Sequence, residues 1–297
     1  MDFKIKERSL RYDINISQAK EIIIKKTDEV RELLKQFLTS QRGTKYLSPS
    51  ALSTYMHCSL QFYFRYIAQL REHDDITEEI DAPLFGNILH ETIDFLYKDF
   101  IGKNVSKEDI QAIKREKIND AIDLSFKIYY FKKDRVDYAG KNIIIRDVIE
   151  KYVLKILKID ADIAPFEIIS LEDTYEIEIP LNINGFSEKV KLGGKIDRVD
   201  KLNDQIRIID YKTGQDHLEF KNIEALFSKK KSERNTAVFQ TLLYGKFYND
   251  LKNPGVAIIP GVYSVRKLFG DQFDFRIFHK ESKSYINDYK SVSEEFL

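Results

Sequence analysis

The sequence predicts an α/β fold in which a helical first half is followed by a compact β-sheet. Apolar residues recur at helical spacing up to about residue 157. From Phe166 onward the pattern alternates with a period of two and is rich in β-branched residues, which is typical of strands. One more helical stretch and one buried strand complete the pattern. With 297 residues, of which 43% are hydrophobic, the chain is long enough to bury a core of this kind.

Five segments of the first half carry a helical pattern. Residues 14–40 alternate apolar and charged positions at helical spacing. Ser48-Pro49-Ser50 has the form of an N-cap followed by proline at the first helical position, so a second helix is expected to begin near Pro49. The other three segments cover residues 84–100, 107–131 and 143–157. We find no internal repeat and no linker rich in Pro or Gly, which favours one continuous unit.

Three strands, a helix and a last strand are expected in the second half. The strands cover residues 174–183, 189–200 and 205–214, where apolar and polar residues alternate. Residues 236–249 return to helical spacing, and residues 255–265 are typical of a buried strand.

The second and third strands are expected to form a hairpin whose register can be worked out. A short turn centred on Asn203-Asp204 places Leu202 opposite Gln205. The same register brings Asp197 to face Asp210. Directly opposed side chains have β-carbons about 5 Å apart, so two ionised carboxylates would repel and destabilise a purely structural hairpin.

Two lysines are expected on the same face of this hairpin. The next pair in register is Lys195 opposite Lys212, because residues two apart along a strand point the same way. Ile206 and Ile208 precede Asp210 on its own face, which predicts a carboxylate at the rim of an apolar core. A hard divalent ion such as Mg²⁺ or Mn²⁺ takes oxygen ligands of this sort, whereas one lysine would neutralise only one of the charges.

Each aspartate by itself also has a structural interpretation. Asp197 could pair with Arg198 or Lys195 on the surface, and Asp210 could cap the bend at residues 212–214. Their joint occurrence, thirteen residues apart across one hairpin and followed by Tyr-Lys, favours a metal site.

The charge balance does not by itself predict a polyanionic partner, because Lys plus Arg and Asp plus Glu number 48 each. Basic stretches lie at residues 229–231 and 132–135, and a solvated loop is the favoured interpretation of each. No stretch approaches the roughly 18 apolar residues of a membrane span, and the N-terminal residues lack the core of a secretory signal. We therefore expect a cytoplasmic protein without a membrane partner.

Five segments together resemble the PD-(D/E)XK nuclease superfamily, and in particular the RecB- and AddB-type nuclease domain of bacterial helicase-nucleases. They are, in order, SPSALSTYMHCSLQFYFRYIAQL, FGNILHETI, GGKIDRVD, IIDYKTG and FQTLLYGKFY. The resemblance covers residues 46–265, and the order of the blocks makes it specific. It implies a restriction-endonuclease-like mixed β-sheet flanked by helices. On this basis residues 46–297 form the nuclease domain, with a helical insertion at about 104–160, and residues 1–45 form an N-terminal helical extension.

The resemblance also implies the roles of several residues. Metal ligands would be Asp197, Asp210, His90 and the backbone carbonyl of Tyr211, and Lys212 would be the catalytic lysine. A lone histidine on a helix is more often a packed or solvent-facing residue than a ligand. Gly86, one turn before His90 on the same face, would let this helix approach the sheet or a phosphate closely.

Further residues are candidates for contact with substrate. Gln240 and Tyr244 share a helical face and match the glutamine-tyrosine motif of the family, although Tyr244 could simply pack. Lys195 is a third substrate-binding candidate.

An additional acid is expected at Glu172, where related nucleases often carry one. Glu176 and Glu178 lie close enough in the sequence to leave that choice open.

Many AddB-like relatives hold an iron–sulfur cluster with four cysteines. Cys58 matches the first of them, but it is the single cysteine of this sequence. We therefore expect no cluster, no intrachain disulfide and a small buried role for Cys58.

These features predict a Mg²⁺- or Mn²⁺-dependent DNA nuclease that works with a helicase domain or subunit in DNA repair or recombination. Lys212 would orient or deprotonate the attacking water or hold a phosphate oxygen. No Walker-type loop is present, so any ATP-driven step would belong to another part of a longer polypeptide or to a partner. The alternatives are a catalytically inactive DNA-binding or scaffold module of the same fold and, less favoured, a stand-alone nuclease of the CRISPR spacer-acquisition type.

Overall fold

The computed structural model describes most of the chain. The described residues are 22–39, 43–70, 80–132, 136–183, 185–214, 217–270 and 273–296. The helices and helical turns are α1 (Asp28–Lys35), α2 (Pro49–His57), α3 (Ser59–Phe62), η2 (Tyr63–Ile67), α4 (Ala82–Tyr97), η3 (Lys98–Phe100), α5 (Lys107–Gln111), α6 (Arg115–Phe126), η4 (Lys127–Phe131), α7 (Lys141–Ile163), α8 (Ile223–Leu226), α9 (Thr236–Lys252) and α10 (Lys290–Phe296).

The strands form two sheets. They are β1 (Asn104–Val105), β2 (Phe166–Ile183), β3 (Phe186–Leu202), β4 (Gln205–Lys212), β5 (Glu219–Phe220), β6 (Ile258–Ser264), β7 (Phe278–His279) and β8 (Ser284–Tyr285). The main sheet has the order β1-β2-β3-β4-β6, and all neighbours are antiparallel except β4 and β6, which are parallel. The predicted mixed sheet is therefore confirmed. The small sheet β5-β7-β8 was not predicted, because strands of two residues carry no periodicity.

The hairpin β3–β4 has the predicted register. Leu202 pairs with Gln205, and the same register continues to the pair Arg198–Ile209. Asn203 and Asp204 form the turn with φ of +49° and +60°. Asn and Asp tolerate this left-handed conformation, which matches the twist of the strands that they connect.

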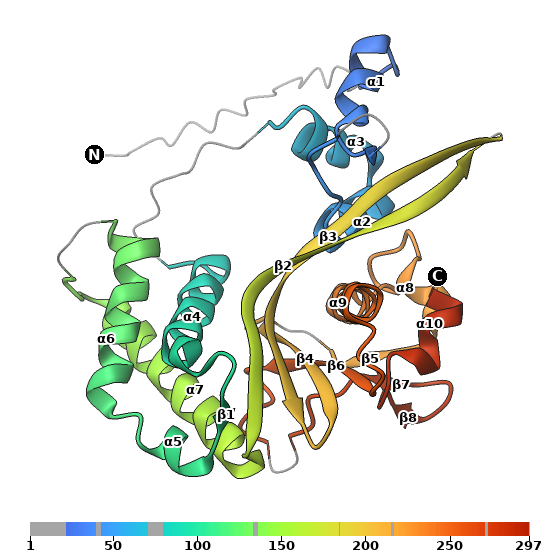
Figure 1. Cartoon of the computed structure of the whole chain (residues 1–297). Coiled ribbons are helices and arrows are strands. Elements are labelled where there is room, and N and C mark those ends of the chain that lie inside the picture. Colours follow the sequence, from blue (N-terminus) through green and yellow to red (C-terminus); the bar gives the residue numbers. More distant parts are fainter. Residues whose placement is uncertain are drawn as a thin grey trace, which may run out of the picture.

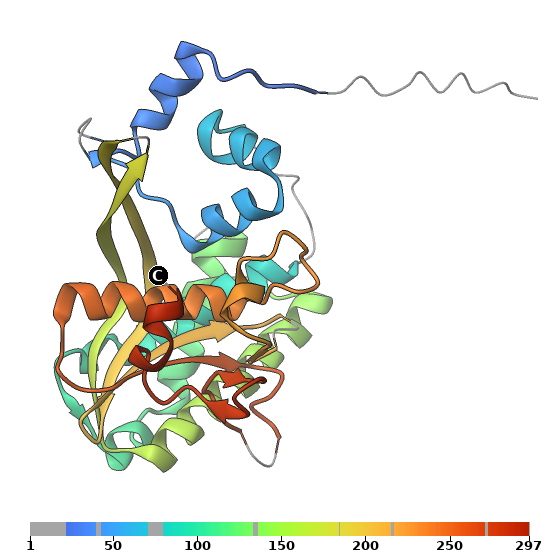
Figure 2. The same cartoon turned by 90° about the vertical axis from the view of Figure 1, so that its right-hand side faces the viewer.

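The strands β2 and β3 form a much longer hairpin than the sequence indicated. They pair from Glu167–Lys201 to Ile183–Phe186, so the hairpin extends well beyond the rest of the sheet (Figure 1). The helices α1 to α3 lie beside its far end (Figures 1 and 2). Leu38 and Leu47 bridge to Val190 and Leu192 of β3.

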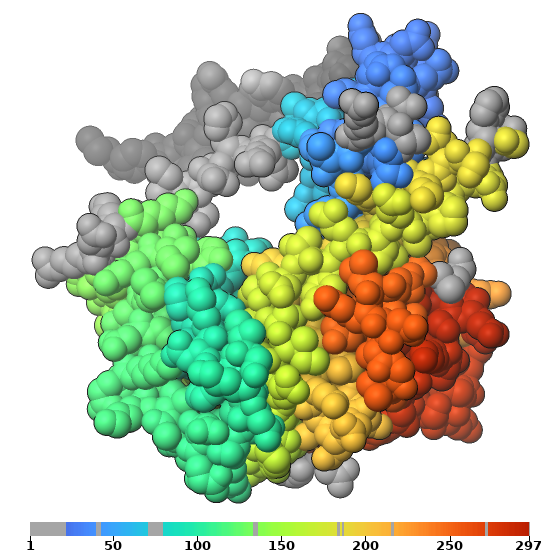
Figure 3. All heavy atoms as spheres, viewed as in Figure 1, coloured from blue at the N-terminus to red at the C-terminus, as the bar shows by residue number. Residues whose placement is uncertain are grey.

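The main sheet separates two apolar cores. On one face, α4, α6 and α7 pack against Phe166, Ile168 and Ile209. On the other face, α9 packs against Ile206 and Ile208. In the space-filling view of Figure 3, the green helical half and the orange-to-red C-terminal part lie on opposite sides of the yellow strands. Successive residues of β4 therefore face different layers.

The N-terminal helix is shorter than the pattern over residues 14–40 predicts. Residues 22–27 are not helical, and α1 begins after the N-cap Thr27. Residues 14–21 and 40 lie outside the described part. The proposed division at residue 45 and the helical insertion at about 104–160 stay predictions; β1 and α5 to α7 occupy the latter range.

Candidate active site

Helix α4 presents His90 to the inner strands β3 and β4. Asp81 caps its N-terminus by accepting a hydrogen bond from the backbone N–H of Leu84, and proline occupies the first turn. A β-carbon added to Gly86 would lie 3.3 Å from Thr213 Oγ1, so the helix approaches the segment that directly follows β4. The imidazole of His90 is half-buried.

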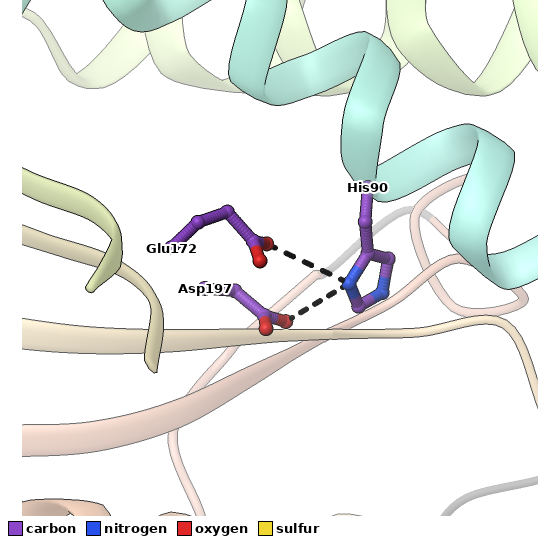
Figure 4. A group of neighbouring side chains, drawn as sticks. All are labelled: His90, Glu172 and Asp197. Carbon is purple, nitrogen blue, oxygen red and sulfur yellow. Dashed lines mark ion pairs between the residues drawn. The ribbon is translucent and has the colours of Figure 1, made fainter. Parts of the chain in front are cut away.

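The two ring nitrogens of His90 face different partners. Nε2 lies 2.7 Å from the backbone oxygen of Tyr211, and Nδ1 lies 3.5 Å from Asp197 Oδ2 and 4.0 Å from Glu172 Oε1 (Figure 4). Because a carbonyl only accepts hydrogen bonds, a neutral ring carries its proton on Nε2. The lone pair of Nδ1 then points at two carboxylates, an arrangement that a cation would relieve.

Asp197 lies at the point where β3 and β4 stop pairing. The β3–β4 ladder ends at Arg198–Ile209, and Asp197 Oδ2 accepts a 2.8 Å hydrogen bond from the backbone N–H of Tyr211. Burial raises the pKa of Asp197, and the charge of Asp210 raises it further, while His90 and the Tyr211 N–H oppose the shift. The charge of Asp210 therefore reaches Asp197, although the ladder ends one pair before the predicted pairing of the two aspartates.

Glu172 is the acid that joins this group. Its φ of +53° is unusual for a residue with a side chain. Burial raises its pKa, and the charge of Asp197 adds to this effect, although the ammonium of Lys195 contacts the carboxylate. Glu176 and Glu178 are exposed on the long hairpin, so the structure favours Glu172 among the three acids.

His90, Glu172 and Asp197 form a potential metal-binding group. One ligand atom from each lies within 4.8 Å of the other two, and this is the one group of its kind among the residues that the structure describes.

Asp210 is directed toward other partners. It is fully buried on β4, and Gln240 Nε2 donates to its Oδ1 at 3.1 Å. The ammonium of Lys212 donates to Oδ1 at 2.9 Å and lies 2.7 Å from Oδ2. Oδ2 is nevertheless buried and accepts no hydrogen bond from any described residue, because the ammonium approaches it outside hydrogen-bond geometry. The ammonium of Lys212 therefore already balances part of the charge of this carboxylate.

The expected pairing of Lys195 with Lys212 does not occur. The register holds only as far as Arg198–Ile209, and beyond it β3 pairs with β2 alone, where Lys195 faces Thr174. Lys195 therefore contacts Glu172, whereas Lys212 contacts Asp210.

Helix α9 contributes the glutamine and tyrosine of the sequence pattern. Gln240 Nε2 donates to the hydroxyl of Tyr244 at 2.7 Å as well as to Asp210. Tyr244 is buried, and a β-carbon on Gly194 would lie 2.8 Å from its ring. Gln240 thus touches the candidate catalytic carboxylate, and Tyr244 holds Gln240 and packs against β3.

Comparison with known families decides which group of proteins this chain belongs to. A sequence model described as the PD-(D/E)XK nuclease superfamily matches residues 46–265. The chain belongs to this superfamily.

Similar proteins bear the name of a subunit of ATP-dependent helicase/deoxyribonuclease. The chain is 27% identical to the one from Streptococcus mutans over 258 residues, which cover 83% of this chain and 19% of that protein. It is 28% identical to the one from Carboxydothermus hydrogenoformans over 247 residues, which cover 74% of this chain and 21% of that protein. The chain therefore spans about a fifth of the length of these curated relatives.

A buried polar network lies directly under the Asp-Tyr-Lys sequence of this PD-(D/E)XK chain. Arg198 is fully buried and donates hydrogen bonds to Asp160 on α7 and to Asp200, at 2.7 Å each. Its Nη1 also lies 3.3 Å from the hydroxyl of Tyr211. Arg207 completes the network by donating two hydrogen bonds to the carboxylate of Asp200, at 2.6 and 2.8 Å.

The sequence contains one signal for this network. In the Asp-Arg-Val-Asp sequence, Arg198 and Asp200 alternate with Asp197 and must point to the opposite face of the strand. Arg198 is thus a partner of Asp160 and not the surface partner of Asp197 that the structural interpretation suggested. Its distant partner on α7 could not be identified from local pattern.

The residues of the site fit a hard divalent cation. Two carboxylates and an imidazole nitrogen converge, and one of these carboxylates, Asp197, accepts a hydrogen bond from the backbone N–H of Tyr211, the residue next to Asp210. Oxygen-rich sets of this kind suit Mg²⁺ or Mn²⁺. Cys58 plays no part: it is half-buried, not buried as expected, and its Sγ accepts a hydrogen bond from the backbone N–H of Gln61.

No helix in the described ranges is long and apolar enough to cross a membrane.

Proposed function

We propose that this chain is a divalent-metal-dependent DNA nuclease module that hydrolyses phosphodiester bonds and works with a helicase in DNA repair or recombination. The observation that carries the proposal is the convergence of His90, Glu172 and Asp197 beside the Asp210–Lys212 ion pair. The names of the similar proteins, helicase/deoxyribonuclease subunits, support DNA as substrate and a helicase as partner.

His90, Asp197 and Asp210 would hold the metal, with Glu172 as an additional acid and the carbonyl of Tyr211 beside them. When bound, Mg²⁺ or Mn²⁺ would offset the negative charge that develops on the phosphate oxygens and would acidify a water molecule. The protein supplies the geometry. The N–H of Tyr211 fixes Asp197, and the carbonyl of Tyr211 orients the ring of His90.

Lys212 is the residue beside the proposed metal ligands that would contact the substrate through a positive charge. Its ammonium lies against the carboxylate of Asp210, half-buried at the end of β4. From this position it would hold a phosphate oxygen or orient the attacking water. Gln240 would keep Asp210 in place through its 3.1 Å hydrogen bond, and Lys195 remains a candidate for contact with the substrate strand.

A cleavage assay tests this function. The wild-type chain, Asp197→Asn and Asp210→Asn are incubated with single- and double-stranded DNA in Mg²⁺, in Mn²⁺ and in EDTA. We expect metal-dependent cleavage by the wild type and by neither of these two variants. Glu178→Gln is the matched control, because Glu178 is an exposed acid of the same hairpin that pairs with Lys189 away from the site.

The alternative function, an inactive DNA-binding or scaffold module of a helicase complex, predicts a different result. The wild type would then be as inactive as the two variants in every metal, while its binding to DNA would persist.

A further inference from the structure

A large cavity lies beside α8 and the start of α9, away from the carboxylates. It has a volume of about 880 Å³, is open to solvent, and is lined by β5, α8, the segment 228–235 and the first residue of α9. In Figure 1, α8 lies next to α9, and the two helices are in contact. Nothing in the chemistry described above uses this cavity.

Arg234 lines the cavity with an uncompensated charge. It is only 6% exposed, and its Nη1 donates to the backbone oxygen of Ser228 at 3.1 Å. Its Nε is buried without a hydrogen-bond partner, and no carboxylate of the described ranges forms an ion pair with it. Burial alone lowers its pKa. A buried guanidinium in this state is costly unless an anion binds to it.

The surroundings of Arg234 favour an anion as well. Lys221 and Lys231 also line the cavity. Three acids line the cavity as well: Glu233 is paired with Lys230 at 3.1 Å and Glu219 with Lys280 at 3.0 Å, and the third is Glu224.

The N-terminus of α9 adds a second source of positive potential. This helix has 17 residues and begins at Thr236, which lines the cavity after the N-cap Asn235. The first N–H groups of a helix have no intrahelical partner and attract anions, and here Asn235 accepts from the N–H of Val238 and leaves the two N–H groups before it for an anion.

The cavity is connected to the candidate active site along α9. Thr236 also lines a smaller pocket of about 230 Å³, together with Gln240 and Ser50. Gln240 in turn donates to Asp210. Thr236 and Gln240 are four positions apart on α9, a rise of about 6 Å, so the cavity begins within a few nucleotides of the candidate active site.

We propose that the cavity around Arg234 binds a backbone phosphate of the nucleic-acid strand, outside the nucleotides that flank the bond that is cleaved. This inference rests on the proposed nuclease function, and it assigns to Arg234 and the N-terminus of α9 the task of holding the strand in register. The same chemistry would accept a free phosphate or a mononucleotide, so the experiment must separate the two sources.

Binding of a fluorescent single-stranded oligonucleotide is measured by anisotropy, in EDTA and at several salt concentrations. No cleavage occurs under these conditions, so the result does not depend on catalytic activity. For Arg234→Gln we expect roughly tenfold weaker binding and a salt slope reduced by about 0.7. The control is Lys229→Gln, which removes the same charge from an exposed residue of the same segment outside the cavity and should change affinity less than twofold.

A second variant guards against misfolding of Arg234→Gln. Thr236→Glu places a negative charge at an exposed position in the first turn of α9, where it should stabilise the helix. The same charge should repel a phosphate, so we expect unchanged or higher Tm together with weaker binding of the oligonucleotide.

Three outcomes are informative. Weaker binding by both cavity variants supports the inference. Affinities within twofold of Lys229→Gln for both variants would overturn it. Inorganic phosphate that raises the Tm of the wild type but not of Arg234→Gln, with oligonucleotide binding unchanged, would identify a free-phosphate site and would also overturn it. Metal-dependent cleavage assayed separately shows whether the proposed function itself fails.

Discussion

Arg198 on β3 and Asp160 on α7 form a fully buried ion pair, with Nη1 of the arginine 2.7 Å from Oδ2 of the aspartate. The pair links the helical layer to the strand that carries Asp197. Asp160 also accepts hydrogen bonds from the hydroxyls of Tyr97 and Tyr263 at 2.6 and 3.0 Å. Both charges are therefore satisfied by several partners, which is the condition under which a buried ion pair is tolerated.

Arg198→Met should destabilise the chain strongly. The substitution leaves Asp160 without its cation in the core, and Asp200 keeps only Arg207, so we expect a loss of about 3–5 kcal/mol in urea unfolding. Adding Asp160→Asn should recover part of this loss, because the orphaned charge is removed. A double variant that is as unstable as the sum of the two single ones would contradict the pairing.

Asp197→Asn should make the metal-free chain more stable at neutral pH. Burial and Asp210 raise the pKa of Asp197 above 3.8, so the folded state binds its proton more tightly than the unfolded state does. Protonated Asp197 contributes to the free energy of unfolding. This contribution is fully present below pH 3.8 and is lost as the pH rises through the raised pKa of Asp197. In EDTA, urea unfolding should therefore show the variant above the wild type at pH 7, with the difference vanishing toward pH 4.

Bound metal should make the wild type more stable than Asp197→Asn. Mn²⁺ that binds only the folded state raises the Tm of the wild type, and it should leave Asp197→Asn unchanged. If Asp197→Asn is the less stable protein at pH 7 in EDTA, repulsion at this site is not the dominant effect.

Glu172→Gln should weaken metal binding without abolishing the fold. Its carboxylate lies 4.0 Å from the Nδ1 of His90, and its pKa is raised chiefly by burial, so removal of the charge costs little in the metal-free state. We expect the Kd for Mn²⁺, measured by calorimetry, to rise on the order of 10- to 100-fold. An unchanged Kd, equal to that of Glu178→Gln, would exclude Glu172 from the metal site.

The two lysines of the hairpin should behave differently. Lys212→Ala should reduce kcat for DNA cleavage by at least about 100-fold, since one positioned charge in the transition state contributes this much. Lys195→Ala should change kcat little and raise KM, because Lys195 is exposed and contacts Glu172, not Asp210. Equal losses of kcat in both variants would contradict the separate roles.

Gln240→Leu should lower kcat more than Tyr244→Phe does. The first change removes the amide that donates to Asp210, and the second keeps the ring against β3 and removes only the hydroxyl that Gln240 contacts. We expect a fall of roughly tenfold for Gln240→Leu, with a Tm close to that of the wild type. A large loss of Tm in this variant would indicate a structural role in place of a positioning one.

Several features of the fold follow from local sequence alone. The left-handed residues Asn203 and Asp204 form the turn, and the turn determines which residues of β3 and β4 oppose each other. The period of two places Asp210 on the face of Ile206 and Ile208. Each of these depends on contacts between residues near in sequence, which is why pattern and turn chemistry were sufficient.

Other features could not be predicted in the same way. The pairing of Lys195 with Lys212 failed because β3 leaves β4 beyond Arg198, a divergence that depends on packing of the long β2–β3 hairpin. The role of Cys58 as the N-cap of α3 also depends on where the chain turns.

What the sequence by itself determined is the order of the main elements and the register of the β3–β4 hairpin as far as Arg198–Ile209. Only the tertiary structure decided that Glu172 and not Glu176 joins His90, that Arg198 pairs with α7, and that a cavity forms around Arg234. The physical reason is the range of the interactions: backbone pairing across a tight turn is dictated by adjacent residues, whereas burial and charge partners depend on segments that are distant in the sequence and meet only when both faces of the sheet are covered.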